Sequence, residues 1–241
     1  MRDNLFLFTL ISAHFIGDFY LQSNTMAILK KDSFFITLKH AVYYSVPFLF
    51  LPLLFEKSLG VVLLSMGLHF LIDLFKFKLE KNKKEGNTIL GLKPKFIYLI
   101  DQGIHFLSLI FIGTISVATL RVSILIESLN LPVFIVILPG ILFLFKPANI
   151  TFKIIFGEYA PLEKENNSVQ GAGAVIGSLE RILMLIFLGL NQFAAVGLIM
   201  TAKSIARYDK ISKDPVFAEY YLIGTLYSIL VTVIIYILFL F

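Results

Sequence analysis

Three pairs of histidine and aspartate are the residues of this sequence that are best suited to do chemistry. All three pairs have the same spacing, and they are His14 and Asp18, His69 and Asp73, and Asp101 and His105. Residues four apart on an α-helix share one face and lie about 6 Å apart along the helix axis. The spacing therefore predicts that each pair forms one polar patch on one helix.

The order of the residues within the pairs predicts that the three patches meet at one depth. Histidine comes first in the first two pairs and last in the third pair. If the third pair lies on a helix antiparallel to the other two, the histidines form one layer and the aspartates form another about one turn away. His40, on a segment between the first two pairs, is expected to reach the aspartate layer.

This combination of side chains predicts a metal centre. Imidazoles and carboxylates that point inward from several helices are typical of metal sites in helix bundles. The expected ligands of a divalent zinc, manganese or iron ion are His14, His69, His105, Asp18, Asp73 and Asp101. This set is too large for one tetrahedral ion, so it suits two ions about 3.5–4 Å apart, or one ion with aspartates that fix the imidazole tautomers.

The catalytic group that activates a water molecule would come from the same cluster. The candidates are Asp18, Asp73, Asp101 and His40. Two interpretations without a metal remain open. Histidine has an ordinary pKa of about 6.5, which suits a proton relay, and each histidine could also bond only to the aspartate of its own helix and join the helices structurally.

The composition indicates which elements position these groups. The chain is 58% hydrophobic and 15% charged, whereas soluble domains carry about 25% charged residues. It has no cysteine, which excludes disulfides and thiolate ligands. The net charge of +5 fits basic loops against anionic lipid better than a nucleic-acid partner. We therefore expect an all-α, polytopic transmembrane helix bundle and no nucleic-acid binding.

Apolar runs predict about seven membrane spans, each bounded by charges or by proline, glycine and asparagine. They are Leu5–Leu21, Phe34–Phe55, Leu59–Leu79, Phe96–Ala118, Leu131–Phe145, Leu179–Ala202 and Phe217–Phe241. The fifth run is short and contains Pro139, so a kinked or re-entrant segment is an alternative. Asn149, just after it, is expected to cap a helix.

We expect one integrated membrane domain with two parts. Residues 1–118 would form a four-helix part with the histidine and aspartate motifs, and residues 119–241 a helical part with a basic cluster.

The distribution of lysine and arginine predicts an orientation. The connection Lys76–Lys95 contains seven lysines and should be cytoplasmic. Strict alternation then also places Lys30 and Lys31 inside, but it places the basic cluster of Lys203, Arg207, Lys210 and Lys213 outside. Either the number of spans after the fourth helix is wrong by one, or the position of these cations is determined by something other than the preference of lysine and arginine for the cytoplasmic side.

Several motifs resemble those of a known bacterial family. They are His14-Phe15-Ile16-Gly17-Asp18-Phe19-Tyr20-Leu21-Gln22, His69-x-x-x-Asp73-x-x-Lys76 and Asp101-Gln102-x-x-His105, followed by Glu180-Arg181 and Ala202-Lys203-Ser204-Ile205-Ala206-Arg207-Tyr208. The chain resembles the bacterial integral membrane family of domain of unknown function 3307. The resemblance implies a multi-pass protein of the bacterial inner membrane and no defined activity. The motifs are similar, more distantly, to those of membrane-bound metal-dependent hydrolases.

Substrate-binding groups are expected near the cluster and at the C-terminal cations. Lys203 and Arg207 are four residues apart and present two cations on one face. Their anion would be Glu219, a lipid phosphate or an anionic substrate. The expected substrate-binding residues are Lys203, Arg207, Gln22, Lys76, Gln102, Glu180 and Glu219.

Three functions follow from these observations. The first is a membrane-embedded metal-dependent hydrolase of a lipid-linked or amphipathic substrate. The second is a transporter or a proton or cation relay that uses the same cluster. The third is a structural membrane subunit. Lys76 and Gln22 continue the polar cluster toward the cytoplasmic face, whereas toward the outer face the sequence offers only apolar residues and serines. This pattern favours an enzyme site that is open on one side over a transport path across the membrane.

Overall fold

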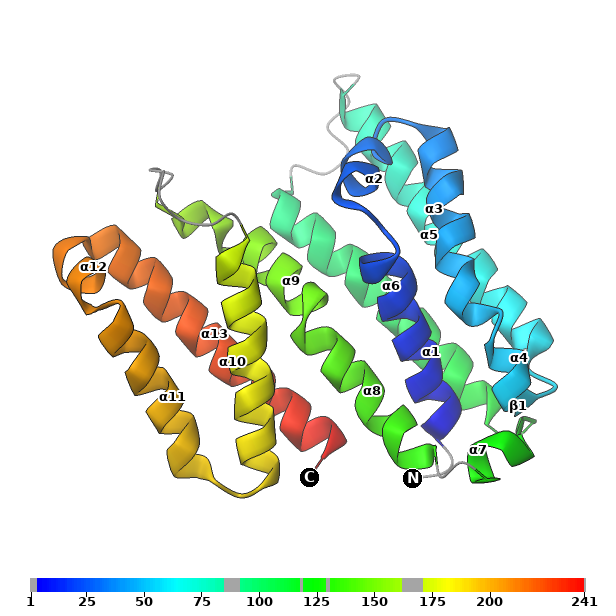
Figure 1. Ribbon diagram of the computed structural model, residues 1–241. Coiled ribbons are helices and arrows are strands. Elements are labelled where there is room, and N and C mark those ends of the chain that lie inside the picture. Colours follow the sequence, from blue (N-terminus) through cyan, green and yellow to red (C-terminus); the bar gives the residue numbers. More distant parts are fainter. Residues whose placement is uncertain (1–3, 85–91, 118, 129–130, 162–170, 241) are drawn as a thin grey trace. The chain divides into compact units, whose positions relative to one another are not determined.

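The computed structural model describes residues 4–84, 92–117, 119–128, 131–161 and 171–240, and these residues are almost entirely helical (Figure 1). Six helical segments are long and apolar enough to cross a membrane: Phe34–Leu54, Leu59–Glu80, Pro94–Ser116, Pro132–Tyr159, Ala172–Gly189 and Pro215–Phe239. Two shorter apolar segments are Leu5–Tyr20 and Phe193–Ala206. This confirms the prediction of an all-α polytopic bundle.

The chain forms two compact units, Met1–Pro139 and Gly140–Phe241. The first unit contains α1 (Leu5–Phe15), the π-helix η2 (Ile16–Tyr20), α2 (Asn24–Leu29), α3 (Phe34–Phe48), α4 (Leu51–Leu54), α5 (Leu59–Lys84), α6 (Pro94–Ser116), α7 (Ile124–Ser128) and the start of α8 (Pro132–Leu144). The two-residue strands β1 (Phe55–Glu56) and β2 (Arg121–Val122) pair antiparallel.

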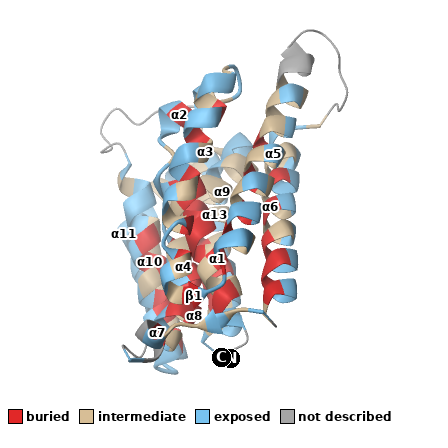
Figure 2. Ribbon diagram, turned by 90° about the vertical axis from the view of Figure 1, so that its right-hand side faces the viewer, coloured by how far each residue is buried: buried red, intermediate tan, exposed pale blue. Residues whose placement is uncertain are grey.

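Local sequence explains where the helices of this unit begin. The hydroxyls of Ser23 and Ser33 accept hydrogen bonds from backbone N–H groups in the first turns of α2 and α3, as N-cap residues do. Pro94 starts α6, where no N–H partner is needed. Helices α1, α3, α5 and α6 pack against one another, and α6 carries buried and exposed residues along its length (Figure 2).

One glycine sets the distance between the first helix and α3. A Cβ atom at Gly17 would lie 2.8 Å from the ring of Tyr44 and 2.9 Å from its carbonyl oxygen. Only glycine permits this approach. The π-helical turn that contains Gly17 also changes the helix phase between His14 and Asp18, and such turns are frequent at functional sites.

The second unit continues α8 into α9 (Lys146–Phe156) and the 3₁₀ turn η3 (Gly157–Tyr159). The remaining helices are α10 (Ala172–Gly189), α11 (Phe193–Ala206), α12 (Tyr208–Lys213) and α13 (Pro215–Phe239). Helix α10 packs against α11 and α13, and α9 packs against α10 and α13. Residues 162–170, which include Lys164, lie outside the described residues.

The fifth predicted span is longer than expected and broken in the middle. It runs over Pro132–Tyr159, with non-helical backbone at Phe145. Pro147 offers no N–H to the turn before it, so the helix cannot continue unbroken. The guanidinium of Arg181 donates to the Leu144 carbonyl at 2.7 Å and to Asn149 Oδ1 at 2.7 Å. Asn149 lies inside α9, so the prediction that it caps a helix is wrong.

The sixth predicted span, Leu179–Ala202, is wrong as a single helix. The chain turns between α10 and α11, which form a hairpin (Figure 1). Asn191 adopts φ +57°, Asn191 N–H bonds to the Leu188 carbonyl, and Gln192 N–H bonds to the Phe187 carbonyl at 2.8 Å. These bonds form a Schellman ending, in which asparagine replaces the more common glycine.

The hairpin predicts a different topology for the C-terminal cations. Because the chain has no cysteine, single substitutions Lys31→Cys, Gln192→Cys and Ser212→Cys can be labelled separately. If the two shorter apolar segments, Leu5–Tyr20 and Phe193–Ala206, cross together with the six longer ones, eight alternating crossings place positions 31 and 212 on one side and position 192 on the other. A membrane-impermeant maleimide applied to oriented vesicles should label position 192 from the side opposite to the other two. The arrangement with seven spans predicts instead that position 192 is buried in the bilayer and unreactive from both sides.

Candidate metal centre

The three predicted pairs and His40 come together inside the first unit. His14 lies on α1, Asp18 on η2, His40 on α3, His69 and Asp73 on α5, and Asp101 and His105 on α6. All seven side chains are buried. Ionisable groups placed among apolar helices are costly unless they compensate one another. The contacts within this cluster are therefore the main determinants of its geometry.

The centre of the cluster is a triangle of three possible ligand atoms. His40 Nε2 lies 3.3 Å from Asp73 Oδ2, His69 Nε2 lies 3.5 Å from the same oxygen, and the two Nε2 atoms are 3.4 Å apart. Zinc with nitrogen or oxygen ligands at about 2.0–2.1 Å holds neighbouring tetrahedral ligands about 3.3–3.4 Å apart. The three atoms thus have the spacing of one face of a tetrahedral metal site.

Two further groups extend this triangle. Asp18 Oδ1 lies 3.2 Å from His40 Nε2, and ligand atoms of Asp18, His40 and His69 all lie within 4.8 Å of one another. The same limit holds for His69, Asp73 and His105. His105 Nε2 is 3.9 Å from Asp73 Oδ1 and has no hydrogen-bond partner among the described residues. Both Asp18 and His105 are thus placed to add a fourth ligand.

His14 lies in the imidazole layer but belongs to neither group of possible ligands. Its ring centroid is 5.8 Å from that of His69 and 5.4 Å from that of His105. Its Nδ1 atom contacts the hydroxyl of Tyr44 at 3.3 Å, and the Tyr44 ring stacks on His69 at 3.4 Å. His14 thus lies beside the centre, although the sequence predicted it to be a ligand. His40 lies in the centre itself.

Asp101 is held by a lysine instead of by the central triangle. Lys76 Nζ donates to Asp101 Oδ2 at 2.7 Å, which is a short charge-assisted bond. The other oxygen, Oδ1, lies 3.8 Å from His105 Nε2. This carboxylate therefore adjoins the centre through His105, and its charge is already compensated by Lys76.

The three substrate-binding candidates of this unit contact the charged groups directly. Gln102 Nε2 donates to Asp18 Oδ2 at 3.0 Å, and Gln22 Oε1 accepts a hydrogen bond from Lys30 Nζ at 3.1 Å. Lys76 bonds to Asp101 as described above. Gln102 and Lys76 thus bond to carboxylates and Gln22 bonds to Lys30, and the role of these three residues in binding a substrate stays a prediction.

Lys30 is a site residue that the sequence did not reveal. Its Nζ atom lies 3.4 Å from each carboxylate oxygen of Asp73 and 3.9 Å from Asp18 Oδ1. Its side chain is 12% exposed. The sequence suggested only a basic loop, because Lys30 follows a turn after the first span and has no fixed spacing to either aspartate.

The centre is closed on one side by apolar packing. One to two turns beyond His14 and His105 on their own helices, the side chains of Leu10, Leu109 and Ile112 join the main core cluster of the unit. On the opposite side, the partly exposed side chains of Gln22, Lys30, Lys76 and Gln102 lie between the cluster and the surface, with Lys76 21% exposed. A path to the centre from this side would pass the two lysines.

The basic cluster of the second unit differs from its prediction. Lys203 Nζ donates to Glu180 Oε2 at 2.7 Å and lies over the ring of Tyr221. Glu219 was the expected carboxylate partner, but it is exposed and forms no ion pair among the described residues. Glu180 is buried, so it compensates Lys203 within the bundle. Lys203 is thus not a free cation for an anionic ligand.

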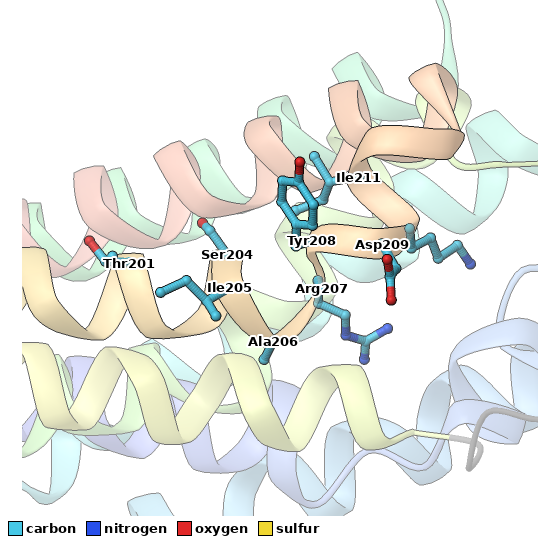
Figure 3. Close-up of a pocket in the computed structure, with 9 residues that line it drawn as sticks. Thr201, Ser204, Ile205, Ala206, Arg207, Tyr208, Asp209 and Ile211 are labelled. Carbon is cyan, nitrogen blue, oxygen red and sulfur yellow. The ribbon is translucent and has the colours of Figure 1, made fainter.

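Arg207 lies at the bend between α11 and α12, where nine residues line an open pocket of about 670 Å³ (Figure 3). Asp209 and Lys210 line the same pocket. The lining therefore contains two cations and one carboxylate. The role of Arg207 in binding substrate stays a prediction.

The ion pair of Lys76 and Asp101 predicts strong coupling between the two residues. Lys76→Met leaves a buried carboxylate uncompensated, and Asp101→Asn leaves the ammonium without its partner. Each should lower the free energy of unfolding, and the double variant should lose about 1–3 kcal/mol less than the sum of the two. Unfolding by SDS followed by circular dichroism measures this. Lys78→Met, at an exposed position of the same helix, is the control, and strict additivity would contradict the assigned pairing.

The comparisons with known proteins agree with this division of the chain. No curated protein and no solved structure matches the sequence. The sequence profile of a protein family matches residues 6–133, which lie within the first unit and include the whole histidine and aspartate cluster; the C-terminal motifs lie outside the match. The chain therefore belongs to the family described as Protein of unknown function (DUF3307).

Proposed function

We propose that the first unit binds one divalent metal ion through His40, His69 and Asp73, with Asp18 or His105 as a further ligand. The observation that supports this proposal is the triangle of ligand atoms with edges of 3.3–3.5 Å. The Nε2 atoms of His40 and His69 lie 3.4 Å apart beside one oxygen of Asp73, and if both carried a proton the two N–H groups would be crowded against each other. A shared cation would satisfy all three atoms at once.

The sharing of His69 favours one ion over two. His69 belongs to both groups of possible ligands, and it presents Nε2 to His40 and to Asp73. A neutral imidazole nitrogen has one lone pair and so binds one ion. Nitrogen and oxygen donors without sulfur suit zinc, manganese or iron.

The surroundings of the centre support metal-dependent hydrolysis as its reaction. A divalent ion in such a site polarises a carbonyl or phosphoryl group and makes a water molecule a better nucleophile at neutral pH. Asp18 or His105, whichever is not a ligand, lies where it could hold the proton that this water gives up. The apolar packing beyond His14 keeps bulk water from the closed side.

The open side favours an anionic, membrane-bound substrate. Lys30 and Lys76 face the carboxylates of Asp18, Asp73 and Asp101, so the cluster would carry one net positive charge once a divalent ion is bound, and Gln22 lies beside Lys30. A lipid-linked or amphipathic molecule with a phosphate or carboxylate group would bring its charge to these cations and leave its apolar part in the bilayer. The site would then serve a metal-dependent hydrolase of the bacterial inner membrane that opens to the cytoplasmic side.

A proton or cation relay is the second candidate, and the position of Lys30 favours it. Lys30 already supplies a positive charge between Asp18 and Asp73. Polar contacts also run from Lys76 through Asp101 and Gln102 to Asp18. On the far side of the cluster, the described side chains are mostly apolar core residues together with serines such as Ser12 and Ser65, and no histidine or carboxylate among the described residues continues the path there, so the hydrolase is the better-supported proposal.

Metal content tests the proposal directly. Protein purified in detergent and equilibrated with zinc or manganese should hold about one ion per chain by elemental mass spectrometry. His40→Ala, His69→Ala and Asp73→Asn each remove one corner of the triangle, and each should lower the content at least about tenfold, as loss of a primary ligand does.

Two controls separate ligands from neighbours. His14→Gln and Asp101→Asn change buried residues outside the triangle and should keep most of the metal. Folded wild-type protein that binds no metal would contradict the metal site and would favour the relay. Equal loss in all five variants would show that the triangle is not the centre of binding.

A further inference from the structure

Lys30 lies beside the carboxylates that a cation bound at the triangle would use. Its Nζ atom contacts both oxygens of Asp73 at 3.4 Å, and Asp73 Oδ2 is one corner of the triangle. Asp18 Oδ1, a possible fourth ligand, is 3.9 Å from the same ammonium. A lysine and a divalent ion would therefore compete for the same carboxylate oxygens.

Charge within the cluster makes simultaneous occupation unfavourable. Three carboxylates, Asp18, Asp73 and Asp101, face two ammonium groups, Lys30 and Lys76, so the cluster carries one net negative charge when its imidazoles are neutral. A divalent ion would add two positive charges a few ångströms from Lys30. Repulsion at such distances is weakly screened in a buried site.

The local structure permits the side chain of Lys30 to leave while its backbone stays in place. The carbonyl of Lys30 accepts a hydrogen bond from the buried hydroxyl of Thr37 at 3.0 Å. Lys30 also ends α2, whose first turn is capped by Ser23. The Lys30 side chain is long and partly exposed, so rotation about its side-chain bonds can move the ammonium to solvent or to a substrate anion.

We propose that Lys30 is an internal cation that compensates Asp18 and Asp73 in the metal-free protein and is displaced when the divalent ion binds. Lys30 thereby sets the metal affinity of the site. Once displaced, its ammonium lies at the open side, where the anionic group of a substrate would enter. This inference rests on the proposed metal site and adds to it a residue that lowers its affinity.

Zinc affinity of the full-length protein in detergent tests the competition, measured by titration against a chromophoric chelator. Lys30→Met removes the competing charge and should bind zinc at least about tenfold more tightly than the wild type. Lys30→Arg keeps the charge and should stay near the wild-type affinity. Lys31→Met, at the neighbouring residue whose side chain is 54% exposed, is the matched control and should not change the affinity.

A second measurement needs no substitution. Lys30 of the wild type should react slowly with an amine-specific acylating reagent without zinc and several times faster with zinc, as read by peptide mass spectrometry. Lys31 should react quickly in both states, and Lys76, bonded to Asp101, slowly in both.

The outcomes distinguish the two proposals. One outcome is that the wild type binds zinc tightly while Lys30→Met binds it no more tightly, and another is that Lys30 of the zinc-binding wild type reacts equally slowly with and without zinc. Either result overturns the proposed competition but agrees with the metal site. Absence of zinc binding in the wild type and in Lys30→Met overturns both. If Lys30→Met fails to fold, the acylation rates of the wild type decide alone.

Discussion

The carboxylate of Asp73 is the interaction on which the arrangement of the first unit depends. It is buried on α5 and is approached by His40 from α3, by His69 from its own helix, by His105 from α6 and by Lys30 from the end of α2. An isolated charge at such a position costs several kcal/mol. The helices must therefore pack in the one register that brings these partners to the carboxylate.

The need to give buried polar groups a partner also explains features of the fold that are otherwise unusual. Gly17 lets the first helix approach α3 closely, and the π-helical turn around it aims Asp18 at His40. In the second unit, Arg181 is buried beside the break between α8 and α9 and donates to the free carbonyl of Leu144. A broken helix inside a membrane is tolerated where such side chains satisfy its backbone.

The sequence was sufficient to predict the cluster because its signal is local. Spacing of four residues and the reversed order of Asp101 and His105 can be interpreted from helix geometry alone. His40 was expected at the aspartate layer from its depth on the segment between the first two pairs, and it contacts Asp18 and Asp73. Contacts between distant segments carry no such signal, which is why Lys30 was missed. The turn at Asn191 was missed because two polar residues within a long apolar run resemble a tolerated interruption of one span.

The central claim is that His40, His69 and Asp73 form a metal site with at least two imidazole ligands. X-ray absorption at the zinc edge of metal-loaded protein tests it most directly, since it reports the identity and distance of the ligand atoms. The account predicts at least two imidazole ligands, with their multiple-scattering pattern, and one or two oxygens at about 2.0–2.1 Å. A shell made only of oxygen atoms, or one with a single imidazole, would contradict it.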